Sequence, residues 1–193
     1  MKIQTLFRLG ALATLLTALG YAIGEAMYLF GNVETLFFAW YVVIVYVFQA
    51  FAYIALYGAQ VKQGDLVLFI GFVISMIATL YTFMDTERRL AWRTGLITEA
   101  QMEQAQQISS FAILLAIGNI AIVLGWIIFG FGVIRTGLFP RAIGIIMMLA
   151  GVAIVVRDVS LVFEYLFAIL SVTAYGWLGW ALWKHADEVK AER

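Results

Sequence analysis

Long apolar blocks separated by short polar breaks dominate this chain. A helix needs about 20 mainly apolar residues to cross the hydrocarbon core of a bilayer, and all but the fifth block reach that length. The blocks are continuous rather than alternating, which favours helices over the strands of a membrane barrel. The pattern predicts an all-α, polytopic transmembrane bundle of about six spanning helices, forming a single domain over residues 1–193. The six blocks are residues 8–30, 37–58, 65–84, 108–134, 142–156 and 160–183.

Composition indicates the same surroundings. Hydrophobic residues make up 64% and charged residues 12% of the 193 positions, whereas a soluble domain carries about a quarter charged residues. The formal net charge is zero, which gives no reason to expect nucleic acid as a partner. The chain contains no cysteine, which excludes disulfides, thiolate metal ligands and a cysteine nucleophile. The predicted partner of most of the surface is therefore the lipid bilayer.

The distribution of lysine and arginine between the short loops predicts an orientation, because such residues are enriched in cytoplasmic loops. Placing both termini in the cytoplasm leaves four of these residues outside, three of them within one longer loop. We therefore expect a multi-pass protein of the cell (inner) membrane with cytoplasmic termini. The inside set is Lys2, Arg8, Lys62, Arg135, Arg141, Lys184, Lys190 and Arg193, and the outside set is Arg88, Arg89, Arg93 and Arg157.

The longest polar break, residues 85–107, predicts the one sizeable extramembrane loop. Within it, Thr98 and Gln101 stand at the spacing of a capping box, in which each side chain bonds the backbone N–H of the other residue. We expect a helix to begin there, outside the membrane, and to run into the fourth block. The preceding residues 87–93 mix arginines with aromatic and apolar residues, which suits either an interfacial segment or a solvated turn.

The only proline, Pro140, lies between the fourth and fifth blocks, in the run Arg135-Thr136-Gly137-Leu138-Phe139-Pro140-Arg141. Its ring removes a backbone donor and disfavours helix at the preceding residue, so it separates two helices. This run resembles the turn in an uncharacterised family of six-helix prokaryotic (bacterial) integral membrane proteins, a domain of unknown function. In that family a helix ends in an Arg-x-Gly-Leu-x-Pro-Arg turn. The resemblance implies a six-helix fold, with Arg135, Gly137, Pro140 and Arg141 as turn and topology determinants, and it brings no activity.

Charged side chains within or beside the apolar blocks mark candidate sites, because charge is costly in hydrocarbon. Glu25 and Glu164 each lie about 8 Å below the outer end of a predicted helix, at 1.5 Å per residue. Arg157 and Asp158 lie in the turn before the last block, and Asp85 is expected to cap the third helix on the same side. Five charges from four helices are thus expected at one end of the bundle.

Two interpretations of these charges stay open. In the first, they form an outward-facing vestibule in which Glu25 and Glu164 bind a cation or exchange protons. In the second, Arg157 pairs with Glu164 or Glu25 and ties helices together. The second is favoured because the sequence supplies an arginine and an aspartate at the right depth.

Other polar residues lie deeper. Gln49 and Asn119 both fall near the middle of the bilayer, where a hydrogen bond between their helices is favoured over a substrate contact. The hydroxyls of Ser75, Thr79 and Thr82 can be satisfied by backbone carbonyls one turn back, so they need no special role.

Pairs of glycines at helical spacing predict faces on which helices pack closely. Packing within the chain is favoured over packing against another protein. The pairs are Gly20 with Gly24, Gly118 with Gly125, and Gly144 with Gly151.

Candidate chemistry is sparse. His185 is the only histidine and lies at a membrane edge, which excludes bis-histidine haem in the bilayer. We see no zinc, phosphate-loop or nucleophile pattern, and therefore expect no cofactor, metal site or catalytic residue. The preferred interpretation is a non-catalytic accessory or interaction subunit of a larger membrane assembly, in contact with other membrane proteins or with its own copies. The alternative is a small ion- or proton-coupled transporter or channel that uses Glu25 and Glu164. An intramembrane enzyme is the least favoured class.

Overall fold

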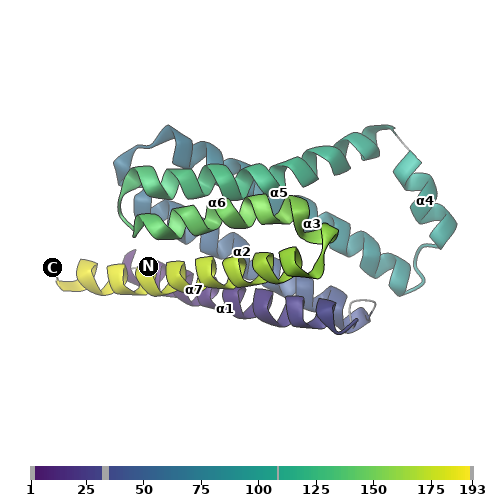
Figure 1. The fold of residues 1–193 in the computed structure, drawn as a ribbon, viewed down its shortest axis with the longest axis horizontal. Coiled ribbons are helices and arrows are strands. Elements are labelled where there is room, and N and C mark those ends of the chain that lie inside the picture. Colours follow the sequence, from purple (N-terminus) through teal and green to yellow (C-terminus); the bar gives the residue numbers. More distant parts are fainter. Residues whose placement is uncertain (1–2, 32–34, 108, 192–193) are drawn as a thin grey trace.

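The computed structural model describes residues 3–31, 35–107 and 109–191, and this part of the chain is helical apart from short connections (Figure 1). Two 3-10 turns, η1 (Val61–Gln63) and η2 (Arg157–Val159), extend the ends of α2 and α6. The α-helices are α1 (Ile3–Leu29), α2 (Leu36–Gln60), α3 (Leu66–Arg93), α4 (Glu99–Gln107), α5 (Ser109–Thr136), α6 (Arg141–Val156) and α7 (Leu161–Ala191).

Five helices, α1, α2, α3, α5 and α7, are long and apolar enough to cross a membrane. The structure therefore indicates a membrane-spanning helical protein. The sixth apolar helix, α6, has only 16 residues, which corresponds to about 24 Å at 1.5 Å per residue. That is shorter than a hydrocarbon core of about 30 Å. It packs along its neighbours α5 and α7 as a shorter member of the bundle.

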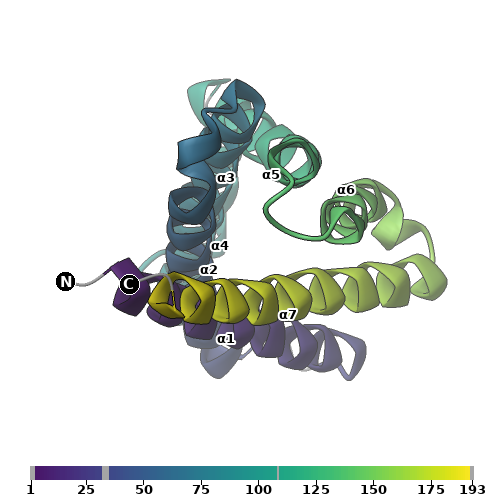
Figure 2. The ribbon, with the colours of Figure 1, turned by 90° about the vertical axis from the view of Figure 1, so that its left-hand side faces the viewer.

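The five long helices and the shorter α6 form a closed ring. Each packs on the next along the chain, in the order α1, α2, α3, α5, α6 and α7, and α7 returns to pack along α1. Seen from the end that carries the termini, α3 and α5 lie on the opposite side of the bundle from α1 and α7 (Figure 2). Both termini lie at one end of the bundle, where Arg8 Nη2 and Asp187 Oδ1 are 2.6 Å apart, while α4 lies at the other end (Figure 1).

The turn between α5 and α6 is built from the residues that the sequence pattern singled out. The helix α5 ends at Thr136, Gly137 adopts φ +66°, and Pro140 stands at the N-cap of α6. A positive φ strains any residue with a Cβ, so glycine is the suitable residue at position 137. Arg135 reaches across to Asp65, the N-cap residue of α3, with Nε and Oδ2 2.8 Å apart. The turn is thereby attached to the start of another helix.

The predicted loop over 85–107 is wrong in its first part, because α3 continues to Arg93. Asp85 lies inside the helix rather than capping it, and it bonds Arg88 and Arg89 at the spacings that stabilise a helix. The predicted capping box is confirmed: Thr98 N–H donates to Gln101 Oε1 at 2.8 Å, and Gln101 N–H donates to Thr98 Oγ1 at 3.2 Å. It starts the short helix α4, whose direction differs from that of α5 (Figure 1).

All six glycines expected to pack closely face another helix of this chain. A Cβ at Gly20 or Gly24 would contact Val45 or Tyr41 of α2, and the Tyr41 hydroxyl donates to the Gly20 carbonyl. A Cβ at either glycine of the second pair would meet α3. A Cβ at either glycine of the third pair would meet α5. The second and third pairs are Gly118 with Gly125 and Gly144 with Gly151.

Candidate functional site: a charged cavity and its inner chamber

A cavity of about 1070 Å³ opens at the end of the bundle remote from the termini. Its walls come from the C-terminal halves of α1 and α3, the N-terminal halves of α2 and α5, the end of α6 with η2, and Phe167 of α7. We call it the distal cavity. Aromatic and aliphatic side chains form much of its surface, and the charged residues that line it are Glu25, Asp85, Arg88, Arg89, Arg93 and Arg157.

Two charged residues of one wall, Glu25 of α1 and Arg157 of η2, interact with the buried Glu164 of α7, and we call these three residues the charged triad. Glu25 is attracted by Arg157 and repelled by Glu164. The Arg157 guanidinium carbon lies 5.9 Å from the Tyr28 ring centre and 5.6 Å from that of Phe167, within the range of a cation–π contact. The triad carries a formal charge of −1, so it is suited to take up a proton or a cationic group.

The members of the triad differ in exposure. Glu25 lines the distal cavity, whereas Glu164, in the first turn of α7, is only 8% exposed. Arg157 lines the cavity beside Glu25. The side chain of Asp158, which the sequence placed in the same cluster, lies outside the described residues.

The opposite wall, formed by the last turns of α3, is cationic. Asp85 is bonded by Arg88 Nη2 at 2.7 Å and by Arg89 Nε at 2.8 Å. Arg93 Nη1 donates at 2.9 Å to the carbonyl of Thr35, the N-cap residue of α2. Three arginines against one aspartate give this wall a formal charge of +2. Sequence reasoning left these arginines in a loop; the spacing of Asp85 from Arg88 and Arg89 is the signal that favours a longer helix.

The expected hydrogen bond between Gln49 and Asn119 is wrong. Asn119 of α5 lines the distal cavity, whereas Gln49 of α2 lies in a separate chamber beneath it and accepts from the Tyr21 hydroxyl at 3.4 Å. The reason is the order of the ring, in which α3 stands between α2 and α5.

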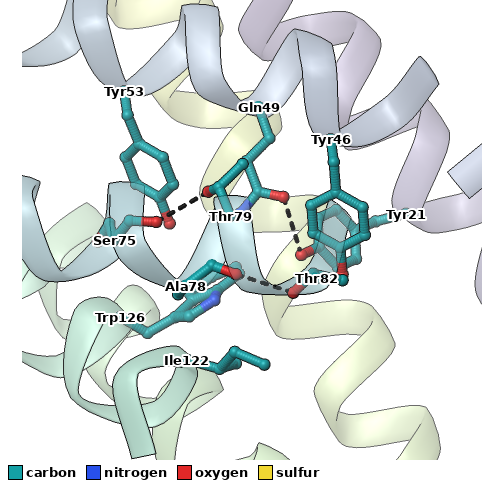
Figure 3. A pocket seen from close by; sticks show the side chains of 10 residues that line it. All are labelled: Tyr21, Tyr46, Gln49, Tyr53, Ser75, Ala78, Thr79, Thr82, Ile122 and Trp126. Atoms are coloured by element: carbon teal, nitrogen blue, oxygen red, sulfur yellow. Dashed lines mark hydrogen bonds between the residues drawn. The ribbon is translucent and has the colours of Figure 1, made fainter. Parts of the chain in front are cut away.

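The inner chamber has a volume of about 20 Å³ (Figure 3). It shares Tyr21, Tyr46, Thr82 and Ile122 with the distal cavity, so it lies directly beneath it. Ala78 and the ring of Trp126 complete a wall that is otherwise rich in hydroxyl groups. The remaining lining residues are Gln49, Tyr53, Ser75 and Thr79.

The hydroxyl groups of the chamber follow the sequence expectation only in part. Thr79 Oγ1 donates to the Ser75 carbonyl at 2.8 Å, and Thr82 Oγ1 donates to the Ala78 carbonyl at 2.9 Å, as expected. Ser75 differs, because its Oγ makes no hydrogen bond of normal geometry within the described residues.

The chamber is closed toward the end that carries the termini. Tyr175 of α7 donates to the hydroxyl of Tyr53 at 2.9 Å, and both side chains are at most 1% exposed. On the far side of this pair, Leu56, Phe129 and Leu178 are completely buried and form an apolar layer. Neither cavity therefore continues past this pair toward the end that carries the termini. The sequence alone carries no signal that brings α2 and α7 together at this pair.

Fold and cavity together define the class: a helical bundle with five candidate membrane spans and a charged cavity open at one end. Within the ranges that the structure describes, no three histidine or carboxylate side chains lie close enough to hold a metal ion. Comparison with protein-family models, curated proteins and solved structures finds no match to this chain.

Proposed function

We propose that this chain is a small membrane transporter or channel whose distal cavity admits a polar solute, with Glu25 and Glu164 as the exchangeable charges. The observation that carries the proposal is the cavity itself, since charged groups from α1, α3 and η2 line one hollow. Its volume of about 1070 Å³ is slightly above the range of about 300–1,000 Å³ that is typical of small-molecule sites. Intramembrane charges that serve only to join helices do not require such a space.

The charges of the two walls favour a particular class of solute. One wall presents the Glu25 carboxylate, and the side chains of α3 that line the other wall carry a formal net charge of +2, so an anionic group and a cationic surface face the same cavity. A zwitterionic solute, with an anionic and a cationic group, matches this arrangement better than a simple ion does. The aromatic side chains that line the cavity, including Tyr28, Tyr41 and Phe167, suit an apolar portion of such a solute.

An accessory subunit needs surfaces that bind another protein, and closely packing glycine faces are one kind of surface that could supply them. The six glycines pack against helices of this chain, which removes that support and favours the transporter or channel. No catalytic role is part of the proposal.

We also propose that the protein resides in the bacterial inner membrane with cytoplasmic termini. The excess of lysine and arginine at the terminal end supports this orientation, and the distal cavity would then open to the outside. Membership of the six-helix family with the Arg-x-Gly-Leu-x-Pro-Arg turn remains part of this proposal.

Cysteine labelling tests whether the distal cavity holds water. The chain has no cysteine, so a single substitution introduces the only thiol. Val42 of α2 lines the cavity, whereas Ile44 of the same helix lies outside it and is 53% exposed. The two variants to compare are Val42→Cys and Ile44→Cys. A membrane-impermeant cationic thiosulfonate added outside intact cells should modify the cysteine at 42 at least about tenfold faster, because lipid shields the one at 44. Equal slow reaction at both positions would show that no aqueous cavity exists, and modification from the inside only would reverse the orientation.

A further inference from the structure

The inner chamber has the size of one water molecule. Its volume is about 20 Å³, and a cavity needs about 10–15 Å³ to hold a water. A solute that fits the distal cavity cannot enter it. A water also needs two to four polar partners, and three polar side chains, Gln49, Ser75 and Tyr53, face the chamber from α2 and α3 (Figure 3).

Ser75 supplies the clearest sign of a missing partner. The residue is 2% exposed, and its hydroxyl oxygen makes no hydrogen bond of normal geometry within the described part of the chain, although the Tyr53 hydroxyl lies beside it. Buried hydroxyls are nearly always hydrogen-bonded to protein or to ordered water. The unused capacity of Ser75 therefore points to an occupant of the chamber.

Gln49 and Tyr53 have capacity to spare as well. The one hydrogen bond from Tyr21 to Gln49 is 3.4 Å long, beyond the usual range for a hydroxyl donor. Tyr175 donates to Tyr53, so the proton of the Tyr53 hydroxyl remains available for donation to another group.

We propose that the inner chamber binds a single ordered water, held by Ser75, Gln49 and Tyr53. This water extends the polar surface of the distal cavity to the Tyr53–Tyr175 pair, which forms the closed end of the chamber. The occupant is water rather than a metal cation, since the chamber offers neutral oxygens and no carboxylate. The water site does not depend on what the distal cavity transports.

A second pair of single-cysteine variants tests the site without any transported solute. Ser75→Cys places the only thiol in the chamber, and Ser171→Cys places it at an equally buried position, 0% exposed, that lines neither cavity. Mercuric ion, which is close to water in size, should react with the cysteine at 75 at least about tenfold faster, because the one at 171 is reached only by local unfolding. The bulky thiosulfonate should react with neither.

Equal rates of mercury reaction at 75 and 171 would overturn the proposal. If the cysteine at 42 reacts with the thiosulfonate while the one at 75 resists mercury, the distal cavity stands and the water site fails. If the cysteine at 42 does not react with the thiosulfonate while the one at 75 reacts with mercury, the water site stands and the aqueous distal cavity fails.

A second measurement uses the unmodified protein in lipid bilayers. In water-edited solid-state NMR, the side-chain amide of Gln49 should receive magnetisation from water. The amide of Gln60 is an internal control on the same helix, since it is 0% exposed and its groups are bonded to the Leu56 carbonyl and the Thr136 hydroxyl. A Gln49 signal that builds up no faster than that of Gln60 would contradict a water in the chamber.

Discussion

Tyr175 donates a 2.9 Å hydrogen bond to the hydroxyl of Tyr53, a residue 122 positions earlier in the chain. The bond joins α7 to α2 across the interior of the ring, where Tyr175 also packs on Tyr21 and Trp126 at ring-centre distances of 5.5 and 5.2 Å. It closes the polar chamber against the apolar layer below.

Removing either hydroxyl of this pair should destabilise the fold. Tyr175→Phe and Tyr53→Phe each leave a buried hydroxyl with one partner fewer, so we expect a loss of about 1–2 kcal/mol in the free energy of unfolding. A double-mutant cycle should give a coupling of about 0.6–1.7 kcal/mol, the range found within membranes. Reversible unfolding in mixed detergent micelles measures both. Tyr165→Phe, at a residue 50% exposed on α7, is the control and should be neutral.

The contact between Asp65 and Arg135 should make the free energy of unfolding depend on pH in the acidic range. Partial burial pushes the pKa of Asp65 up, but the Leu68 N–H and the Arg135 guanidinium outweigh it and hold the pKa below its ordinary value. A depressed pKa stabilises the folded state above the ordinary carboxyl pKa of about 3.9, and this contribution disappears as the pH falls through the lower folded value. Stability should therefore decline below about pH 4.

Substitutions at position 65 separate the ion pair from the helix cap. Asp65→Asn keeps an N-cap oxygen and loses the charge, so it should cost less than about 1 kcal/mol and remove the decline in acid. Asp65→Ala also loses the cap and should cost about 1 kcal/mol more. Unfolding measured from pH 3 to pH 7 checks both, and identical acid profiles for the wild type and Asp65→Asn would contradict the assignment.

The charged triad should control transport. If Glu25 and Glu164 are the exchangeable charges, replacing either by Gln should lower solute uptake into liposomes by at least about tenfold, which corresponds to about 1.4 kcal/mol. Zwitterions should enter faster than simple anions or cations of similar size. Glu103→Gln, on the exposed helix α4, is the matched control and should retain full uptake. Uptake that Glu25→Gln and Glu164→Gln leave unchanged would remove the two carboxylates from the mechanism.

Glycine packing can be tested with two alanine substitutions. A Cβ at Gly144 would overlap the carbonyl oxygen of Gly130 in α5, whereas a Cβ at Gly58 of α2 would meet nothing within 4 Å. Gly144→Ala should therefore destabilise the bundle by about 1–3 kcal/mol. Gly58→Ala should be neutral or stabilise it by up to about 1 kcal/mol, because it restricts the unfolded chain. Thermal unfolding in detergent compares the two, and equal effects would show that α5 and α6 pack less closely.

Features that depend on neighbours along the chain could be predicted. The apolar blocks, the capping box of Thr98 and Gln101, and the break at Pro140 all act within one or two helical turns. The placement of Glu25, Asp85 and Arg157 at one end could also be predicted. In antiparallel helices of known length, the depth of each residue follows from its distance along the helix, at 1.5 Å per residue.

Features that depend on the rotation and order of the helices could not be predicted. Gln49 and Asn119 were expected to meet because they lie at the same depth, but α3 stands between their helices and each lines a different cavity. The end of α3 was placed too early, because the arginines that extend it read as a loop when taken alone.

By itself, the sequence determined that this protein consists mainly of apolar helices long enough to span a membrane, with the charges within or beside the apolar blocks gathered near the end remote from the termini, since helix formation and hydrophobicity are local properties. Only the tertiary structure decided that Tyr21, Gln49, Tyr53 and Ser75 surround one small chamber. That arrangement depends on how side chains from distant segments pack against each other, for which hydrophobic periodicity carries no information.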